Sequence, residues 1–338
     1  MQLSPDKGWK LRRRQKGVKS GRSACRVAAV SILVLNTSPF VEQQRAALAQ
    51  LAPDEQVHCD PMSAPPGDVE ALLAFRLAPG IASRFPALKF VACAGAGVDQ
   101  LLANCDVPAH LPVVRAVDPM QGQRMAQYVT LMTLRFHREL PRLETLHAEG
   151  QWHRFLPFDE RKHAVGIMGY GSIGAPIADA LSMLGFPIRV WTRASRSIEG
   201  VDAFAGPEQL APFLAGSAIL VCALPLTPAT TGLLAASAFA ALPRGAFVVN
   251  VSRGAVLRED DLLAAVNSGH LAGAALDVFE TEPLPTASPL WRHSKILCTP
   301  HIAAMPRPEV AARHFLENLR RARAGLELLN VVDRSRGY

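Results

Sequence analysis

Short apolar runs alternate along the chain with longer segments whose apolar residues recur every three to four positions. The short runs are typical of buried strands, whereas the longer period indicates helices with one apolar face. The predicted strands cover residues 27–35, 69–75, 89–94, 164–168, 187–192, 218–222, 246–251, 272–276 and 295–298. The predicted helices cover residues 41–51, 120–150, 175–184 and 308–329. This alternation predicts an α/β protein built on parallel sheets.

The predicted strand 164–168 runs directly into a glycine-rich turn, Gly169-Tyr170-Gly171-Ser172-Ile173-Gly174, which opens the next helix. Strand, turn and helix in this order are the context in which G-x-G-x-x-G indicates a dinucleotide site. Gly169 would permit the tight turn, Gly171 would let the backbone approach a pyrophosphate, and Gly174 would let the helix pack closely. The sequence therefore predicts a Rossmann-type site in the middle of the chain.

A second glycine-rich turn, Ala94-Gly95-Ala96-Gly97-Val98-Asp99, follows the predicted strand 89–94 and opens another helix. This turn lacks the third glycine of the dinucleotide motif. A small anion such as a carboxylate therefore fits it better than a pyrophosphate.

The composition is that of a globular protein, with 49% hydrophobic and 19% charged residues and a mean hydropathy of +0.14. No apolar run approaches the roughly 20 residues that a membrane helix requires. The six cysteines are scattered without a C-x-x-C pair. This usage indicates reduced thiols of a cytoplasmic protein and neither a disulfide framework nor a metal site.

The positive charge of the chain is concentrated at its beginning. Residues 1–26 hold nine basic residues and one acid, a charge of +8 against +7 for the whole chain, so the remainder carries −1. We expect a disordered extension here; the alternatives are a twin-arginine export signal and a nucleic-acid-binding tail. The apolar run 27–35 after Arg12-Arg13-Arg14 is short and leads into a strand-to-helix turn at 36–39, which argues against export. The near-neutral body argues against a nucleic-acid partner.

Three further segments lie at or just beyond strand ends, where open α/β sheets bind ligands. They are Asn250-Val251-Ser252-Arg253-Gly254, Asp277-Val278-Phe279-Glu280-Thr281-Glu282-Pro283-Leu284 and Thr299-Pro300-His301-Ile302-Ala303-Ala304. Each segment alone is better explained by an ordinary role, as an exposed arginine, an acidic loop, or a core or capping histidine.

Taken in order with the glycine turn at 169–174, these segments resemble the D-2-hydroxyacid dehydrogenase family, from about residue 30 to the C-terminus. Residues 94–99, Ser288-Pro289-Leu290-Trp291 and Arg336-Gly337-Tyr338 resemble its glyoxylate/hydroxypyruvate reductase subgroup most closely. The resemblance implies two Rossmann-like, doubly wound parallel-sheet domains, the cofactor domain being inserted into a discontinuous substrate domain. The implied boundaries are 27–119 and 300–338 for the substrate domain and 120–299 for the cofactor domain.

The resemblance also implies a role for each matching residue. Arg253 would clamp the carboxylate and keto oxygens of the substrate, His301 would act as the general acid, and Glu282 would orient and charge the imidazole. The implied cofactor-binding residues are Gly169, Tyr170, Gly171, Ser172, Ile173, Gly174, Leu224, Pro225, Thr227, Val251, Ser252, Asp277 and His301, with Asp277 at the nicotinamide end. The implied substrate-binding residues are Ala96, Gly97 and Arg253, with Phe75 and Trp291 as pocket candidates that could equally serve packing. A homodimer through the long helix is a further expectation from the family.

The choice of cofactor can be argued from charge. NAD-dependent enzymes place an acid at the end of the second strand, whereas strand 187–192 ends in Thr192-Arg193-Ala194-Ser195-Arg196, with no acid before Glu199. A hydroxyl and two guanidiniums, from Thr192, Arg193 and Arg196, suit a 2′-phosphate, so NADPH is predicted over NADH. The alternative is that the two arginines are merely solvated.

The expected function is NADPH-dependent reduction of glyoxylate, hydroxypyruvate or a related 2-keto acid to the D-2-hydroxy acid. A phosphoglycerate dehydrogenase is disfavoured by the missing acid and by the lack of a regulatory extension. A formate dehydrogenase is disfavoured because Glu282 is present. The alternative from another class is a corepressor-like protein that senses NAD(P)(H), since such proteins can retain all three catalytic residues.

Overall fold

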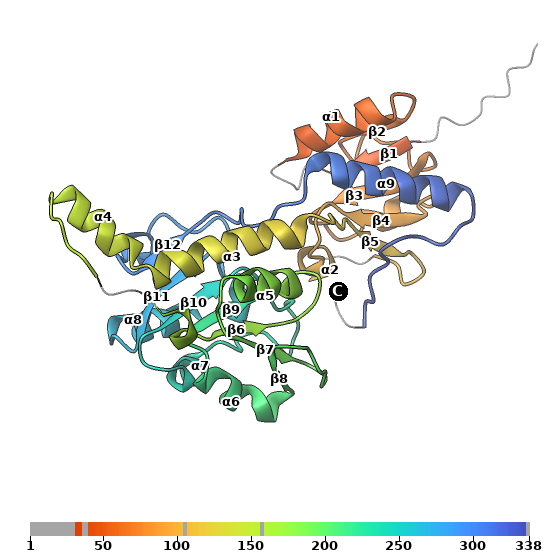
Figure 1. Cartoon of the computed structure of the whole chain (residues 1–338). Helices are drawn as coiled ribbons and strands as arrows, with labels where there is room; N and C mark the ends of the chain where they lie inside the picture. The colour runs from red at the N-terminus through yellow and green to blue at the C-terminus, as the bar shows by residue number, and fades with distance from the viewer. Residues whose placement is uncertain (1–30, 36–39, 104–106, 156–158, 336–338) are drawn as a thin grey trace, which may run out of the picture.

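The computed structural model describes residues 31–35, 40–103, 107–155 and 159–335, and these form two parallel-sheet units (Figure 1). The basic extension predicted at 1–26, the start of the first predicted strand, the turn at 36–39 and the terminal motif at 336–338 lie outside these residues.

The chain folds into strands that alternate with helices. The strands are β1 (Ser31–Val34), β2 (Gln56–His58), β3 (Val69–Ala74), β4 (Phe90–Cys93), β5 (Val113–Arg115), β6 (Val165–Met168), β7 (Ile188–Thr192), β8 (Asp202–Ala205), β9 (Ile219–Cys222), β10 (Ala246–Asn250), β11 (Leu271–Leu276) and β12 (Ile296–Cys298). The helices are α1 (Val41–Leu51), α2 (Asp99–Ala103), α3 (Gln121–His137), α4 (Leu140–Ala148), α5 (Gly174–Met183), α6 (Leu210–Ala215), α7 (Ala236–Ala241), α8 (Glu259–Asn267) and α9 (Pro308–Arg323).

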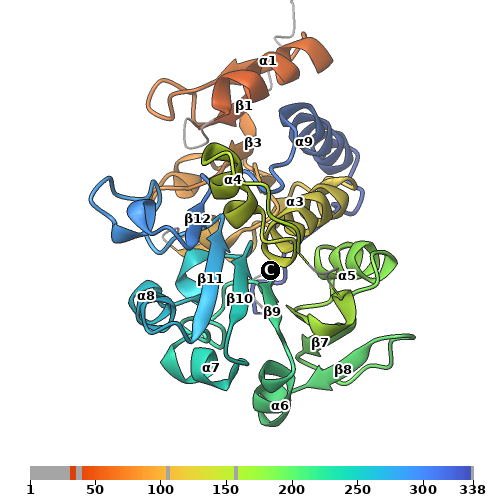
Figure 2. The same ribbon diagram turned by 60° about the vertical axis from the view of Figure 1, so that its left-hand side comes forward.

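The first unit is a five-stranded parallel sheet in the order β2-β1-β3-β4-β5. Its inner strands β1, β3 and β4 are almost entirely buried because both faces of the sheet are covered, as expected for a parallel sheet. One face packs against α1 and α9, with Phe315 of α9 beside Phe90 at 5.6 Å between ring centroids. The C-terminal segment also returns here, because Val331 pairs with Val114 of β5. The last part of the chain therefore completes the first unit, as both views show (Figures 1 and 2).

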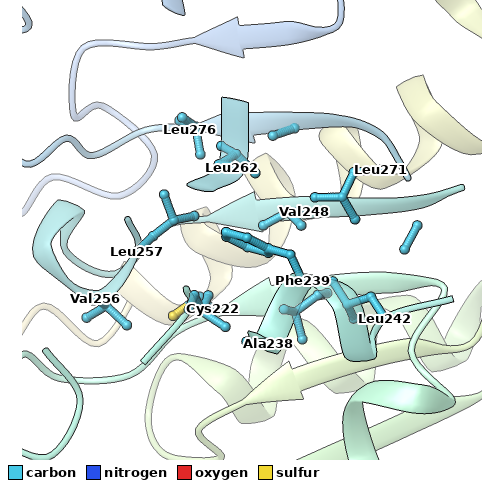
Figure 3. Packing of buried hydrophobic residues seen from close by; sticks show 14 of the residues in the cluster. Cys222, Ala238, Phe239, Leu242, Val248, Val256, Leu257, Leu262, Leu271 and Leu276 are labelled. Atoms are coloured by element: carbon cyan, nitrogen blue, oxygen red, sulfur yellow. The ribbon is translucent and has the colours of Figure 1, made fainter. Parts of the chain in front are cut away.

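The second unit is a seven-stranded parallel sheet in the order β12-β11-β10-β9-β6-β7-β8. Helices α3 and α5 cover one face, and α6, α7 and α8 cover the other. Figure 3 shows Phe239 of α7 and Leu262 of α8 packed over Val248 in the second of these layers. The strand order reverses between β6 and β9, which is where doubly wound sheets bind ligands. The predicted fold class, with one α/β unit inserted into another, is confirmed.

Two predicted helices were too long. The helix expected over 120–150 is broken into α3 and α4, because Pro141 cannot continue the hydrogen-bond ladder and Glu139 takes a left-handed conformation (φ 50°) before it. The helix expected over 308–329 ends at Arg323, because Gly325 adopts φ 66° and the Leu326 amide bonds back to the Arg321 carbonyl.

Three short strands, β2, β5 and β8, are absent from the predicted elements, and all lie at sheet edges. In β8 no residue is buried, and only Ala203, Phe204 and Ala205 are apolar, a run too short to indicate a strand. Among the residues described, no helix is long and apolar enough to cross a membrane.

Candidate active site

The glycine turn lies between the ends of β6 and β9, at the point where the strand order reverses. Gly169 has φ 96°, and a β-carbon there would lie 2.9 Å from the carbonyl oxygen of Ala223. A β-carbon at Gly174 would collide with the Gly169 carbonyl. The protein itself therefore requires glycine at both positions. At Gly171 a β-carbon would meet nothing within 4 Å, so the backbone there faces open space that a ligand could fill.

The turn after β10 is shaped by the fully buried Asn250. The Asn250 Oδ1 atom accepts hydrogen bonds from the amide (3.1 Å) and hydroxyl (2.8 Å) of Ser252, and its Nδ2 donates to the Arg253 carbonyl (3.2 Å). A β-carbon at Gly254 would collide with the backbone of Phe279. The turn that carries Arg253 is therefore fixed both to its own strand and to the loop after β11.

Arg253 reaches from the seven-stranded unit to the glycine-rich turn of the five-stranded unit. Its Nε donates to Oδ1 of Asp99 (2.9 Å) and its Nη1 donates to the Ser252 carbonyl (2.8 Å). Its Nη2 lies so close to the α-carbon of Gly97 that a β-carbon there would collide with it. The predicted clamp and the predicted anion-binding turn thus meet across the two units.

The predicted acid and its carboxylate partner form an ion pair. Nδ1 of His301 lies 2.8 Å from Oε2 of Glu282, and the Phe279 amide donates to Oε1 of Glu282 (3.1 Å). Burial acts to raise the pKa of Glu282. The hydrogen bond and the charge of His301 outweigh that effect, with help from Phe279 and Arg253, and hold the pKa of Glu282 below its usual value. Because Glu282 occupies Nδ1, Nε2 is the atom of His301 left to address a substrate.

The loop that carries His301 is held by Asp277, which is 2% exposed. Its carboxylate accepts hydrogen bonds from the hydroxyl of Thr299 (2.6 Å) and from the amides of Ile302 and Ala303 (2.9 Å each), and its carbonyl accepts from the His301 amide (2.9 Å). These bonds support the left-handed backbone conformation of His301 (φ 55°), which residues other than glycine rarely adopt. Asp277 thus holds the loop, while its predicted contact with the nicotinamide stays a prediction.

Tyr128 extends this arrangement to α3. Its hydroxyl lies 2.6 Å from the hydroxyl of Thr299, and burial raises the pKa of Tyr128 to about 12. The phenol therefore stays protonated at neutral pH. This link is not predictable from the sequence, because the two residues are 171 positions apart.

The residues predicted around the 2′-phosphate lie at the end of β7. The Thr192 hydroxyl donates to the Ala194 carbonyl (2.8 Å), so it shapes the loop, and Arg193 is exposed. The guanidinium of Arg196 donates to the Tyr170 carbonyl (2.9 Å) and lies 5.8 Å from the Tyr170 ring centroid. A cation therefore stands beside the glycine turn.

The remaining predicted contacts divide between exposed and internal positions. Ser172 and Pro225 are exposed, and the loop after β9 is closed by the Thr230 hydroxyl, which accepts from the Thr227 amide (2.8 Å). Leu224, Val251 and Ser252 are buried, and Ile173 is half-buried against the core. The hydroxyl of Ser252 is engaged by Asn250 and lies 3.2 Å from the sulfur of Cys222. These internal side chains support the walls of the site, and any contact they make with the cofactor stays a prediction.

The pocket candidates lie on two different loops. The ring of Phe75 follows β3 and packs beside Gly95, next to Ala96 and Gly97. Trp291 lies in the short helical turn Pro289–Arg292, with its indole nitrogen donating to the Pro285 carbonyl (3.1 Å). Phe75 is therefore placed at the predicted anion site, whereas the role of Trp291 stays a prediction.

Asp99 ends the second glycine-rich turn and has no role among the sequence-based predictions. A carboxylate beside a turn expected to bind an anion is a local conflict of charge, and such a conflict indicates a nearby cation. That signal could have pointed to Arg253, although their separation of 154 residues hides the pairing from the sequence.

The chain is similar along most of its length to known proteins. Residues 130–303 match the model of the D-isomer specific 2-hydroxyacid dehydrogenase NAD binding domain. The chain is 39% identical over 310 residues to glyoxylate/hydroxypyruvate reductase A of Serratia proteamaculans, covering 89% of this chain and 98% of that one.

Two solved structures are similar along nearly the whole chain. One is the D-isomer specific 2-hydroxyacid dehydrogenase from Xanthobacter autotrophicus in complex with NADPH and MES (43% identity, TM-score 0.83, 92% and 100% of the two chains covered). The other is the NADPH-dependent glyoxylate/hydroxypyruvate reductase from Sinorhizobium meliloti with NADP and sulfate (34%, TM-score 0.84, 91% and 100%). This chain therefore belongs to the D-isomer specific 2-hydroxyacid dehydrogenase family.

Proposed function

We propose that the protein is an NADPH-dependent reductase of glyoxylate, hydroxypyruvate or a closely related 2-keto acid, and that its product is the D-2-hydroxy acid. The relative from Serratia proteamaculans is named a glyoxylate/hydroxypyruvate reductase, and the one from Sinorhizobium meliloti an NADPH-dependent glyoxylate/hydroxypyruvate reductase. The observation that carries the proposal is the meeting of Arg253 with the Gly97 turn, together with the His301–Glu282 pair.

The residues divide the reaction between them. Arg253 and the backbone of Ala96 and Gly97 bind the substrate carboxylate, and the guanidinium also polarises the keto oxygen. When bound, NADPH supplies the hydride that adds to the carbonyl carbon. His301 gives the proton on Nε2 to the carbonyl oxygen, and Glu282 stabilises the imidazolium until that transfer. The neutral imidazole then takes a proton from water.

The residues present fit a bound dinucleotide. Gly171 lies just before α5, and its α-carbon faces open space. A pyrophosphate can approach the backbone there because no side chain stands in the way. The helix N-terminus behind it favours negative charge.

The preference for NADPH is assigned to Arg193 and Arg196. Arg196 is supported in this role by its hydrogen bond to Tyr170, and Arg193 by its exposure. Thr192 contributes through the loop, because its hydroxyl proton is already used by Ala194. The two guanidiniums attract the negative charge of a 2′-phosphate. The acidic side chain that would bind the ribose hydroxyls of NADH is missing at this position.

The activity is tested by NADPH oxidation against a panel of 2-keto acids, in the wild type and in His301→Ala. Loss of the general acid lowers kcat by roughly 10²- to 10⁴-fold. His110→Ala, which removes an exposed histidine, is the matched control. A His301→Ala variant with the wild-type rate would remove His301 from its role. Tight NADPH binding with no turnover across the panel would instead support a sensing protein.

The cofactor assignment is tested with Arg193→Ala and Arg196→Ala. We expect each to lower kcat/KM with NADPH by about 10-fold or more and to leave kcat/KM with NADH nearly unchanged, because only NADPH carries the extra charge. Arg161→Ala removes another exposed arginine and serves as the control. A wild-type preference for NADH would contradict the assignment.

The division of the chain is part of the same proposal. Residues 27–119 and 300–338 would form the substrate domain, and residues 120–299 the cofactor domain. The packing of α9 on the five-stranded sheet and the family match over 130–303 support it. Separate expression of residues 120–299 should give a folded unit that binds NADPH, and an insoluble product would contradict these boundaries.

A homodimer in the cytoplasm completes the proposal. Helix α4 has no buried residue and projects from the body (Figure 1), while Leu131 on α3 is 57% exposed and Trp152 after α4 is 89% exposed. Apolar side chains on a projecting element are typical of a subunit contact. A monomer mass in light scattering at micromolar concentration would contradict the dimer.

A further inference from the structure

The guanidinium of Arg253 is held on two sides before any ligand enters. Nε is occupied by Asp99 and one proton of Nη1 by the Ser252 carbonyl, at 2.9 and 2.8 Å. These two bonds fix the plane of the guanidinium. The Nη2 edge is then the one turned toward the α-carbon of Gly97.

The carboxylate of Asp99 has an electrostatic cost where it stands. It follows the turn proposed to bind the substrate carboxylate, so on its own it would repel that anion. The Asp99 and Arg253 side chains are 18% and 23% exposed, so solvent screens their attraction less than that of a surface pair. Asp99 therefore neutralises part of the charge of Arg253, which weakens the attraction for an anion. An aspartate at this position is explained if it has another role in the site.

The pair also joins the two units of the protein. Asp99 begins α2 beneath the five-stranded sheet, whereas Arg253 follows β10 of the seven-stranded sheet. Arg115 donates to the Ala96 carbonyl (3.4 Å) from within the five-stranded unit. Arg115 therefore reaches the predicted anion site from within the unit that carries it, whereas Arg253 reaches it from the other unit.

We propose that Asp99 is a positioning residue, which turns the Nη2 edge of Arg253 toward the substrate site and links the two units of the protein. This inference rests on the proposed function. Asp99 does not contact the substrate, and it acts only through Arg253. Its removal should therefore weaken the use of the 2-keto acid and leave the affinity for NADPH unchanged.

The inference is tested by a double-mutant cycle. Asp99→Ala should lower kcat/KM for the 2-keto acid by about 10- to 100-fold, the value expected for one charge-assisted hydrogen bond, with an unchanged Kd for NADPH. Asp99→Asn should restore part of the loss, because an amide oxygen still accepts from Nε. In an Arg253→Ala background, Asp99→Ala should change kcat/KM by less than about threefold. Gln100→Ala, the neighbouring position on α2, is the control for local unfolding.

Oxalate is the second probe, since its binding to the NADPH complex requires no turnover. If Asp99→Ala weakens oxalate binding in the wild type but not in the Arg253→Ala background, the positioning role is supported whether or not the protein reduces a 2-keto acid. Absence of turnover across the panel would overturn the proposed function alone. Equal losses from Asp99→Ala in the wild-type and Arg253→Ala backgrounds overturn the positioning role. So does a wild-type kcat/KM in Asp99→Ala.

Discussion

Substituting alanine at two glycines of one motif should give opposite results. At Gly174 the new β-carbon would collide with the Gly169 carbonyl, a backbone atom that cannot move without shifting α5. At Gly171 the new β-carbon would meet no protein atom within 4 Å, and its φ is not left-handed. We therefore expect Gly174 to be required for packing and Gly171 to be required for binding the cofactor.

The magnitudes follow from these surroundings. Forcing a methyl group into packed backbone costs about 1–3 kcal/mol, and each kcal/mol lowers Tm by about 2–4 °C for a domain of roughly 150–250 residues. Alanine at the unstrained Gly171 changes stability by at most about 1 kcal/mol, and in the stabilising direction. If the methyl group removes one backbone hydrogen bond to a phosphate, the loss is about 1.5–3 kcal/mol, or roughly 10- to 100-fold in Kd.

The assay measures two quantities on each variant: the Tm of the apoprotein and the Kd for NADPH by calorimetric titration. Gly174→Ala should melt several degrees below the wild type. Gly171→Ala should melt with the wild type and bind NADPH about 10- to 100-fold more weakly. Wild-type affinity in Gly171→Ala would refute the reasoning. A drop in its Tm as large as that of Gly174→Ala would refute it as well.

Three further predictions concern the groups around the acid and the distal end of α3. Glu282→Gln should lower kcat by about 10-fold or more with little change in the Kd for NADPH, because the imidazolium loses its anion; equal kcat would exclude that role. Tyr128→Phe removes a 2.6 Å hydrogen bond to Thr299 and should lower kcat by about 2- to 10-fold, a change that stopped-flow single turnovers would resolve; the prediction fails if only KM moves. Burial and the nearby charge of His137 lower the pKa of His163. Just below pH 6.5 the unfolded chain therefore binds more protons at this residue than the folded chain, and the free energy of unfolding falls as the pH is lowered. Urea unfolding of His163→Gln between pH 7 and 5 should show a shallower fall, and a slope as steep as that of the wild type would contradict it.

The central strands and the fold class were predictable because parallel strands covered on both faces are apolar throughout. β3, β6 and β9 show this, with nearly every residue buried. Edge strands such as β8 lack that pattern. The helix break before Pro141 was readable in principle, since proline interrupts a helix wherever it falls beyond the first turn.

The site was only partly predictable. The resemblance implied roles for Arg253, Glu282 and His301, and the structure pairs Glu282 with His301 and Arg253 with Asp99. The residues that hold them in place could not be found from the sequence: Asp99 lies 154 positions from Arg253, and Asp277 holds the His301 loop through bonds to backbone amides. Contacts of this kind depend on the order of the strands in the sheets, which cannot be derived from the pattern of apolar residues.

The contact between Gly254 and the backbone of Phe279 has a consequence for redesign. At Gly254 no side chain separates the turn that carries Arg253 from the loop that carries Glu282, so a shift of one backbone requires a shift of the other. We therefore expect a substitution that displaces Arg253 there to displace Glu282, and with it the hydrogen bond to His301. New substrate ranges are therefore more accessible through the loops of the five-stranded unit, around Phe75 and Gly95, where a ring and not backbone sets the spacing.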